Sequence, residues 1–305
     1  MSRVGTGLLI GFAAALASCS GGSHSALSAP RPRASAPTST TIITTTTATT
    51  TSTTVVPITS PDQLTAPTDA PSTAAELTRV ERALRSDGGD ASTRLALGWA
   101  QQLAYGALSA HPEWADEALG ALPDDVKPAV LANRDAAVRL SSPDLGAPPA
   151  SLPEWTIRTP PPAAVLIGYY REAEAESGIP WPYFAAIHFV ETRMGRIHGN
   201  STAGAQGPMQ FIPSTWATYG NGGDINDDRD AILAAGRFLA DRGGAGDIDR
   251  ALHAYNPSDA YVAAIKDYAG VIAADPRAYD GYYAWQVYVT TTAGTQRLPE
   301  GWHNP

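Results

Sequence analysis

The chain of 305 residues has a single cysteine, Cys19. One cysteine excludes disulfide bonds within the fold, and it leaves neither a set of thiolate metal ligands nor a cysteine nucleophile downstream. Charge is also sparse, because Asp, Glu, Lys and Arg make up 17% of the residues, against about 25% in an average soluble domain. The formal net charge is −9. No basic stripe is available to neutralise phosphates, so we expect no nucleic-acid partner.

Long apolar runs are missing too. The longest one, residues 4–17, follows a short positive start and is too short for a membrane span, which needs about 20 residues. It has the build of a secretory signal peptide. The run ends in Leu-Ala-Ser-Cys19, which resembles the bacterial lipobox, whose cysteine becomes the lipidated first residue. The resemblance implies a signal peptide over 1–18 and an exported protein of the bacterial cell envelope. Its lipid on Cys19 would anchor it to the outer face of the cytoplasmic membrane; the alternative is a signal peptide cut elsewhere.

Residues 19–72 consist mainly of Thr, Ser, Pro, Ala and Gly, with a threonine tract from Thr38 to Thr54. Such a segment cannot bury enough apolar surface to offset its chain entropy. We therefore predict a disordered tether that holds a folded region away from the membrane. Threonines beside prolines are also candidates for O-glycosylation.

The remaining chain is predicted to be mostly α-helical. A helical subdomain of four helices is expected over 73–142, with Val138 on the apolar face of the fourth, and a Pro- and Gly-rich linker follows over 143–153. Residues 154–305 form the predicted catalytic domain. Its one strand is expected where Tyr283, Trp285, Val287 and Val289 alternate with other residues. Its helices are expected over 162–176, 182–194, 213–219, 228–242, 247–255 and 258–271.

Glu191 is the strongest candidate for chemistry. Prolines 180 and 182 suit the first turn of a helix, and Phe184, Ile187 and Glu191 then share one helical face. A carboxyl group on an apolar face is desolvated, which favours its protonated form. A carboxylic acid that stays protonated near neutral pH can protonate a leaving-group oxygen.

Two further blocks follow the acid. The first runs Ser201-Thr-Ala-Gly-Ala-Gln-Gly-Pro-Met-Gln210, where glycines permit a tight backbone, Met209 gives an apolar wall and Gln210 an amide. An amide both donates and accepts hydrogen bonds, so it suits sugar hydroxyls and N-acetyl groups. The second is Ala-Tyr255-Asn256 at the end of an amphipathic helix.

Taken in order, Glu-Thr, Ser-x-Ala-Gly-Ala-x-Gly-x-Met-Gln and Ala-Tyr-Asn resemble the motifs of lytic transglycosylases with a goose-type lysozyme-like fold. The resemblance covers residues 179–272, about a third of the chain. Two positions depart from the common pattern, since Thr192 replaces a serine and Pro208 a leucine. Both keep the size or chemistry of the residue they replace.

The resemblance implies cleavage of the MurNAc–GlcNAc β-1,4 bond of peptidoglycan, with Glu191 as acid and then base. It places Ser201, Met209 and Gln210 along a glycan cleft, while Asn256 binds substrate or holds the turn. Tyr255 is expected beside the Glu191 carboxyl, which it would hold by a hydrogen bond. At the start of the same helix, Tyr183 is a further candidate for glycan contact. Peptidoglycan strands are the expected partner of a monomer that needs no cofactor.

A second catalytic carboxylate, as ordinary glycosidases use, is not evident. The acidic run at Asp224, Asp227, Asp228 and Asp230 is better explained by a helix N-terminus. It also lacks the closing Glu of a calcium loop. A single acid suffices if the C6 hydroxyl of the sugar attacks C1, which gives a 1,6-anhydro end. The alternatives are a lysozyme-type hydrolase, a non-catalytic wall-binding module and a structural spacer.

Overall fold

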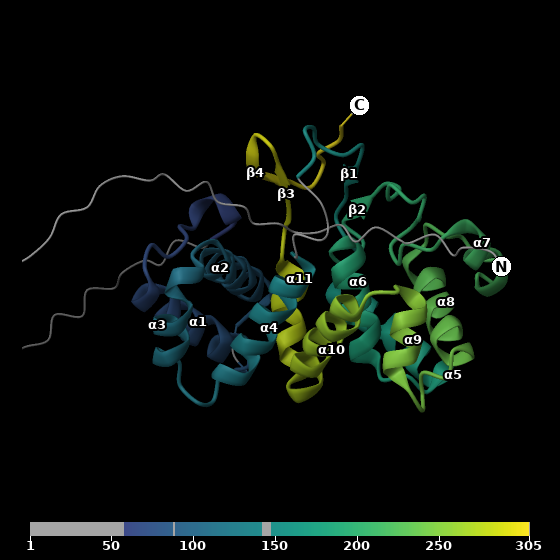
Figure 1. Ribbon diagram of the computed structural model, residues 1–305, viewed down its shortest axis with the longest axis horizontal. Helices are drawn as coiled ribbons and strands as arrows, with labels where there is room; N and C mark the ends of the chain where they lie inside the picture. Colours follow the sequence, from purple (N-terminus) through teal and green to yellow (C-terminus); the bar gives the residue numbers. More distant parts are fainter. Residues whose placement is uncertain (1–57, 88, 142–147, 305) are drawn as a thin grey trace, which may run out of the picture. The chain divides into compact units, whose positions relative to one another are not determined.

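The computed structural model describes residues 58–87, 89–141 and 148–304. The lipidation site Cys19, the signal peptide, most of the predicted tether and the first half of the predicted linker lie outside these residues. The described part is mostly helical, as predicted, with eleven α-helices and two small two-stranded sheets (Figure 1).

The chain enters the described part through a 3₁₀ turn, η1, and four α-helices follow. Asp69 caps α1 and Asp90 caps α2, each accepting a hydrogen bond from a backbone N–H in the first turn. Helix α1 begins before the boundary at residue 72 that we predicted for the tether. The bounds are η1 Pro61–Gln63, α1 Ala70–Leu84, α2 Ala91–Ala110, η2 Pro112–Trp114, α3 Ala115–Ala121 and α4 Lys127–Leu140.

The fourth helix differs from its prediction in one respect. Val130 is fully buried, but Val138 is 55% exposed, so Val138 does not belong to the apolar face. Eight residues separate the two valines, which rotates the second one away from the core on a helix of 3.6 residues per turn.

The second half of the chain contributes seven α-helices. Six of them, α5 to α10, have ends within a few residues of those predicted, whereas α11 was not predicted. Asp227, Asp247 and Ser258 cap α8, α9 and α10. The bounds are α5 Ala163–Ser177, α6 Trp181–Thr192, α7 Pro213–Tyr219, α8 Asp228–Asp241, α9 Ile248–Tyr255, α10 Asp259–Ala274, η4 Pro276–Ala278 and α11 Tyr279–Ala284.

The strands are short and antiparallel. Strand β1 (Thr156–Ile157) pairs with β2 (Ile197–His198), and β3 (Val287–Thr291) pairs with β4 (Gly294–Leu298). The prediction of a strand starting at Tyr283 was wrong at its beginning. Tyr283 lies in α11 and Trp285 caps that helix, because their rings pack with the aromatic cluster of the core.

One hydrophobic core extends through both halves of the described chain. Helix α10 packs on α4 and α6, and α11 packs on α2 (Figure 1). The α2–α11 approach is close because it is made by glycines. A Cβ on Gly98 would lie 2.5 Å from that of Ala284, and one on Gly281 would lie 2.4 Å from the Gln101 side chain.

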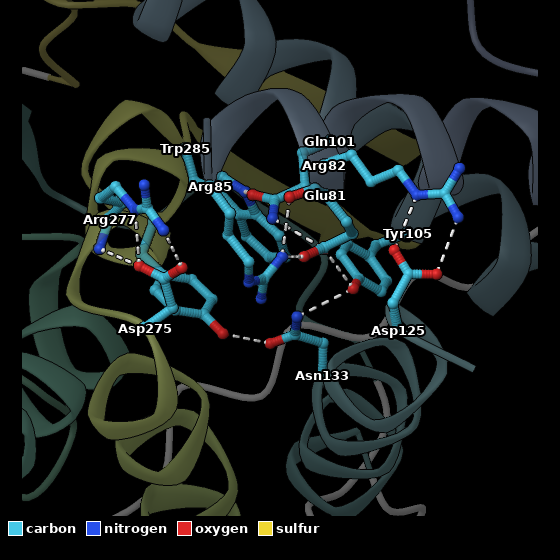
Figure 2. A network of polar contacts seen from close by, with 11 residues as sticks. Glu81, Arg82, Arg85, Gln101, Tyr105, Asp125, Asn133, Asp275, Arg277 and Trp285 are labelled. Atoms are coloured by element: carbon cyan, nitrogen blue, oxygen red, sulfur yellow. Dashed lines mark hydrogen bonds and ion pairs between the residues drawn. The ribbon is translucent and has the colours of Figure 1, made fainter. Parts of the chain in front are cut away.

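A buried polar network also joins the two halves (Figure 2). The fully buried Glu81 of α1 accepts hydrogen bonds from Gln101 and Tyr105 of α2 and pairs with Arg85. Gln101 in turn accepts from the indole N–H of Trp285, at 2.9 Å. Each buried polar group named here therefore has a partner, which removes most of its desolvation cost.

None of the helices in the described ranges combines the length and apolar composition needed to cross a bilayer.

Candidate functional site

Glu191 lies near the end of α6, on the face predicted for it. Phe184 and Ile187 of that face are fully buried, and the Glu191 side chain is half-buried. Burial raises the pKa of the Glu191 carboxyl from 4.5 to about 7, and the hydrogen bond from Tyr261 opposes part of that rise. The predicted shift toward the protonated form is thus confirmed, and a large part of the Glu191 population keeps its proton at neutral pH.

Tyr261 is the residue that holds this carboxyl. Its hydroxyl donates to Glu191 Oε1 at 2.8 Å, and the ring is completely buried. The Ser258 hydroxyl caps α10 by accepting from the Tyr261 backbone N–H, so the first turn of α10 fixes the direction of the phenol.

Tyr255 plays a different part from the one expected. Its pKa is raised by burial and by the nearby charge of Glu191, so it does lie close to the acid. Its hydroxyl, however, donates to the Met209 backbone carbonyl at 2.5 Å and not to Glu191. The predicted hydrogen bond from Tyr255 to the acid was therefore wrong: Tyr255 ties α9 to the loop that carries Met209.

The end of α6 is shaped by an unusual backbone. Arg193, Met194 and Gly195 are consecutive residues with positive φ, at 54°, 61° and 81°. Thr192 stabilises this turn, since its hydroxyl accepts from the Gly195 N–H at 3.1 Å and donates to the Pro208 carbonyl at 2.6 Å. The Thr192 hydroxyl therefore links the end of α6 to the loop over 200–211.

The loop over 200–211 folds into two tight turns. Ser201 closes the first one, since its hydroxyl accepts from the Ala205 N–H at 3.0 Å. Gly207 opens the second with a φ of 73°, and a Cβ there would lie 1.8 Å from the Ile225 carbonyl oxygen. Only glycine fits this position. Met209 is fully buried beneath the turn.

Gln210 sits at the end of the second turn with a φ of 49°. Its amide NH₂ donates to the Gly207 carbonyl at 2.9 Å and, more weakly, to that of Gly199 at 3.4 Å. Its carbonyl oxygen is buried and accepts no hydrogen bond from the described residues. A strained backbone and an unpaired buried acceptor in one residue are features of functional sites.

The remaining predicted residues lie around this loop and helix. Asn256 is nearly buried and ends α9, and the Ser258 backbone N–H donates to its carbonyl. This contact is made by the Asn256 backbone carbonyl, so the predicted roles of the Asn256 side chain stay predictions. Tyr183 is partly exposed in the first turn of α6, two turns before Glu191, and packs at the edge of the core.

Other ionisable groups near the acid have structural partners. Asp227 accepts from the Asp230 N–H as the N-cap of α8, which confirms the reading of the acidic run as a helix start. His188, one turn before Glu191, is completely buried, with Nδ1 2.8 Å from the Tyr170 hydroxyl and Nε2 3.3 Å from Asp228. In the described ranges no three His, Cys, Asp or Glu residues are grouped as metal ligands.

Comparisons of the chain with protein-family models, with curated proteins and with solved structures found no match. The site thus has to be interpreted from its own geometry. Sequence reasoning missed Tyr261, although one signal was available: Tyr261, Ile265 and Tyr268 recur at helical spacing directly after Ser258, so they share the buried face of α10.

Proposed function

We propose that the chain is a lytic transglycosylase, which cleaves the MurNAc–GlcNAc β-1,4 bond of peptidoglycan and leaves 1,6-anhydro ends. One observation carries the proposal. The three sequence blocks are joined by hydrogen bonds, from Thr192 to the Pro208 carbonyl and from Tyr255 to the Met209 carbonyl, and Tyr261 donates to the half-buried Glu191 of the first block. The goose-type lysozyme-like fold is part of this proposal, supported by the motif order and the helical architecture.

The proposed reaction uses Glu191 twice. With its pKa raised to about 7, the protonated carboxyl donates its proton to the glycosidic oxygen as the C1–O bond breaks. The resulting carboxylate then accepts the proton of the C6 hydroxyl while that oxygen bonds to C1. The proton count balances, because Glu191 ends protonated as it began and no water is consumed.

The neighbouring groups support both steps. The Tyr261 hydroxyl stabilises the carboxylate formed in the first step, because it donates to Glu191 Oε1. Gln210 is proposed to position the sugar from the loop over 200–211, because an amide both donates and accepts hydrogen bonds. The N-acetyl carbonyl of the substrate can stabilise the positive charge at C1, which replaces the second carboxylate of ordinary glycosidases.

The test is a digestion of purified peptidoglycan sacculi with mass-spectrometric analysis of the products. We expect 1,6-anhydro ends from the parent chain and none from Glu191→Gln. The control Glu117→Gln changes a carboxyl that is exposed on α3, and it should digest like the parent. Substantial cleavage by a folded Glu191→Gln protein would disprove the role of the acid.

The same digestion separates two of the alternatives from the proposal. Reducing ends, heavier than anhydro ends by one water, would identify a lysozyme-type hydrolase. Binding without any cleavage would identify a wall-binding module. The raised pKa of Glu191 favours an enzyme, because a binding site gains nothing from an acid poised near neutrality.

The membrane anchor is a separate part of the proposal and depends on Cys19 alone. Cys19→Ser should release the protein from the membrane fraction in a cell fractionation. Retention of that variant in membranes would rule out lipidation at Cys19 as the anchor.

A further inference from the structure

His188 is a buried histidine that the proposed reaction does not use. It is completely buried on α6, one turn before Glu191. Its Nδ1 lies 2.8 Å from the Tyr170 hydroxyl, and its Nε2 lies 3.3 Å from Asp228 Oδ1. Both Nε2 and Asp228 Oδ1 are buried, and neither has a hydrogen-bond partner among the described residues. The two atoms therefore depend on each other to offset the cost of their burial.

This contact joins the end of α6 to the start of α8. Asp228 is the first residue of α8, and the turn that ends α6 covers the contact. Gly195 of that turn has a φ of 81°, and a Cβ there would collide with Asp228 Oδ1 and lie 3.2 Å from His188 Nε2. The close approach therefore needs glycine, and the contact is enclosed by α5, α6, α8 and this turn.

The segment before α8 is fixed to the first turn of that helix. Asp230 Oδ2 accepts from the Asp224 N–H at 2.9 Å, and the Asp224 carbonyl accepts from the Asp227 N–H at 3.0 Å. Ile225 lies inside this hydrogen-bonded loop. The position of its carbonyl is therefore set by the position of Asp228.

The Ile225 carbonyl supports the turn that ends in Gln210. Gly207 packs directly on that carbonyl, where no Cβ would fit. The Gly207 carbonyl in turn accepts from the backbone N–H of Gln210 at 3.0 Å and from its side-chain amide at 2.9 Å. The contact between His188 and Asp228 is thus connected to Gln210 through the start of α8, Ile225 and Gly207.

We propose that His188 and Asp228 are positioning residues, which hold the turn over 207–210 in the geometry that binds sugar. The binding role of Gln210 rests on the proposed function, whereas the effect on the geometry of the turn does not. Burial and the hydrogen bond from Tyr261 set the pKa of Glu191. Loss of the contact between His188 and Asp228 therefore weakens substrate binding more than it slows the chemical step.

Two substitutions of His188 separate its two contacts. The amide of asparagine reaches about as far as Nδ1 of histidine, and the amide of glutamine reaches about as far as Nε2. His188→Asn thus keeps only the Tyr170 side, and His188→Gln keeps only the Asp228 side. Asp228→Asn removes the charge of the other partner and keeps its shape. Asp259→Asn is the matched control, because Asp259 is likewise the first residue of its helix, α10, and is fully exposed.

Hydrogen exchange measures the geometry of the turn without a substrate. Mass spectrometry of the full chain follows a peptide over 200–212, whose amides form hydrogen bonds within the two turns. We expect His188→Asn and Asp228→Asn to exchange these amides about tenfold faster. His188→Gln and Asp259→Asn should match the parent, and a peptide from α2 should exchange alike in all variants.

Three results would overturn the positioning role. They are unchanged exchange over 200–212, equal acceleration by His188→Asn and His188→Gln, and equal acceleration in α2, which would mean a general loss of stability. If His188→Asn does not fold, Asp228→Asn measured against Asp259→Asn decides.

Kinetics on soluble peptidoglycan strands test the link to substrate. We expect His188→Asn and Asp228→Asn each to raise KM about tenfold with kcat near the parent value. The charge of Asp228 also acts on His198, so the double variant is needed: it should be no worse than Asp228→Asn alone, because both changes remove one contact. A fall in kcat at unchanged KM would overturn the role in binding. An inactive parent chain would refute the proposed function and leave the exchange result to decide the positioning role.

Discussion

At the scale of single residues, two tyrosines near Glu191 have different partners. Tyr261 donates to the carboxyl, and Tyr255 donates to a backbone carbonyl. The sequence motif pointed to the vicinity of the acid correctly, but it could not say which phenol reaches the carboxyl. That choice depends on the angle between α9 and α10, which is set by packing and not by local sequence.

The different partners of Tyr261 and Tyr255 predict how the rate of cleavage depends on pH. Cleavage should decline as pH rises past about 7, the pKa of Glu191, because the first step needs the protonated acid. The Tyr261 hydrogen bond lowers that pKa. Tyr261→Phe should therefore move the alkaline limb to higher pH, whereas Tyr255→Phe should leave the limb in place. Initial rates of sacculus digestion over pH 5–9 would measure both. Identical limbs for Tyr261→Phe and the parent would contradict the assignment.

The same acid predicts a change in stability. Its pKa is raised in the fold, so the native state binds the proton more tightly, and stability falls as pH rises from 4.5 to about 7. Glu191→Gln removes this loss of stability, because glutamine carries no charge at any of these pH values. Above pH 7 the variant should be more stable than the parent by about 2–3 kcal/mol, and the difference should vanish below pH 4.5. Urea unfolding at pH 8 and pH 4 measures the difference in stability between the variant and the parent. The same difference at both pH values would mean that burial does not shift the pKa of the Glu191 carboxyl.

At the scale of elements, Thr192 connects α6 to the loop over 200–211. Thr192→Val keeps the shape but leaves the Gly195 N–H and the Pro208 carbonyl without their partner. We expect a loss of about 1–3 kcal/mol in unfolding free energy, while Thr192→Ser stays close to the parent. Denaturant unfolding of the two variants distinguishes a hydrogen-bonding role from simple packing, in which case Thr192→Ser would be the worse variant.

Helix positions were largely predictable from the sequence, because capping residues and apolar spacing mark them locally. Asp227, Asp247 and Ser258 each cap the helix that was expected to start there. The predictions that failed depend on contacts between residues far apart in the sequence. Tyr283 and Trp285 alternate like a strand, but Trp285 contacts α2 and α6, and the Tyr283 ring packs on Tyr279 within α11.

At the scale of the whole molecule, the helices α1–α4 share the core of the second half. Phe189 of α6 packs on Tyr282, which hydrogen-bonds Asn133 of α4. A fragment of residues 148–305 would expose these surfaces, so we expect it to aggregate or to lose cooperative unfolding. Circular dichroism and size-exclusion chromatography would test this. A monomeric fragment with the thermal midpoint of the full chain would show instead that α1–α4 form an independent subdomain.

The glycine contact between α2 and α11 has a consequence for synthesis. Gly98 lies against residues of the last helix, Gly281 and Ala284. During translation, α2 leaves the ribosome long before its partner exists, and contacts between such distant positions slow folding. A nascent chain that ends before α11 therefore lacks the helix against which α2 packs. If the chain is exported in an unfolded state, the late formation of the α2–α11 contact keeps it unfolded, and so competent for export, until synthesis is complete.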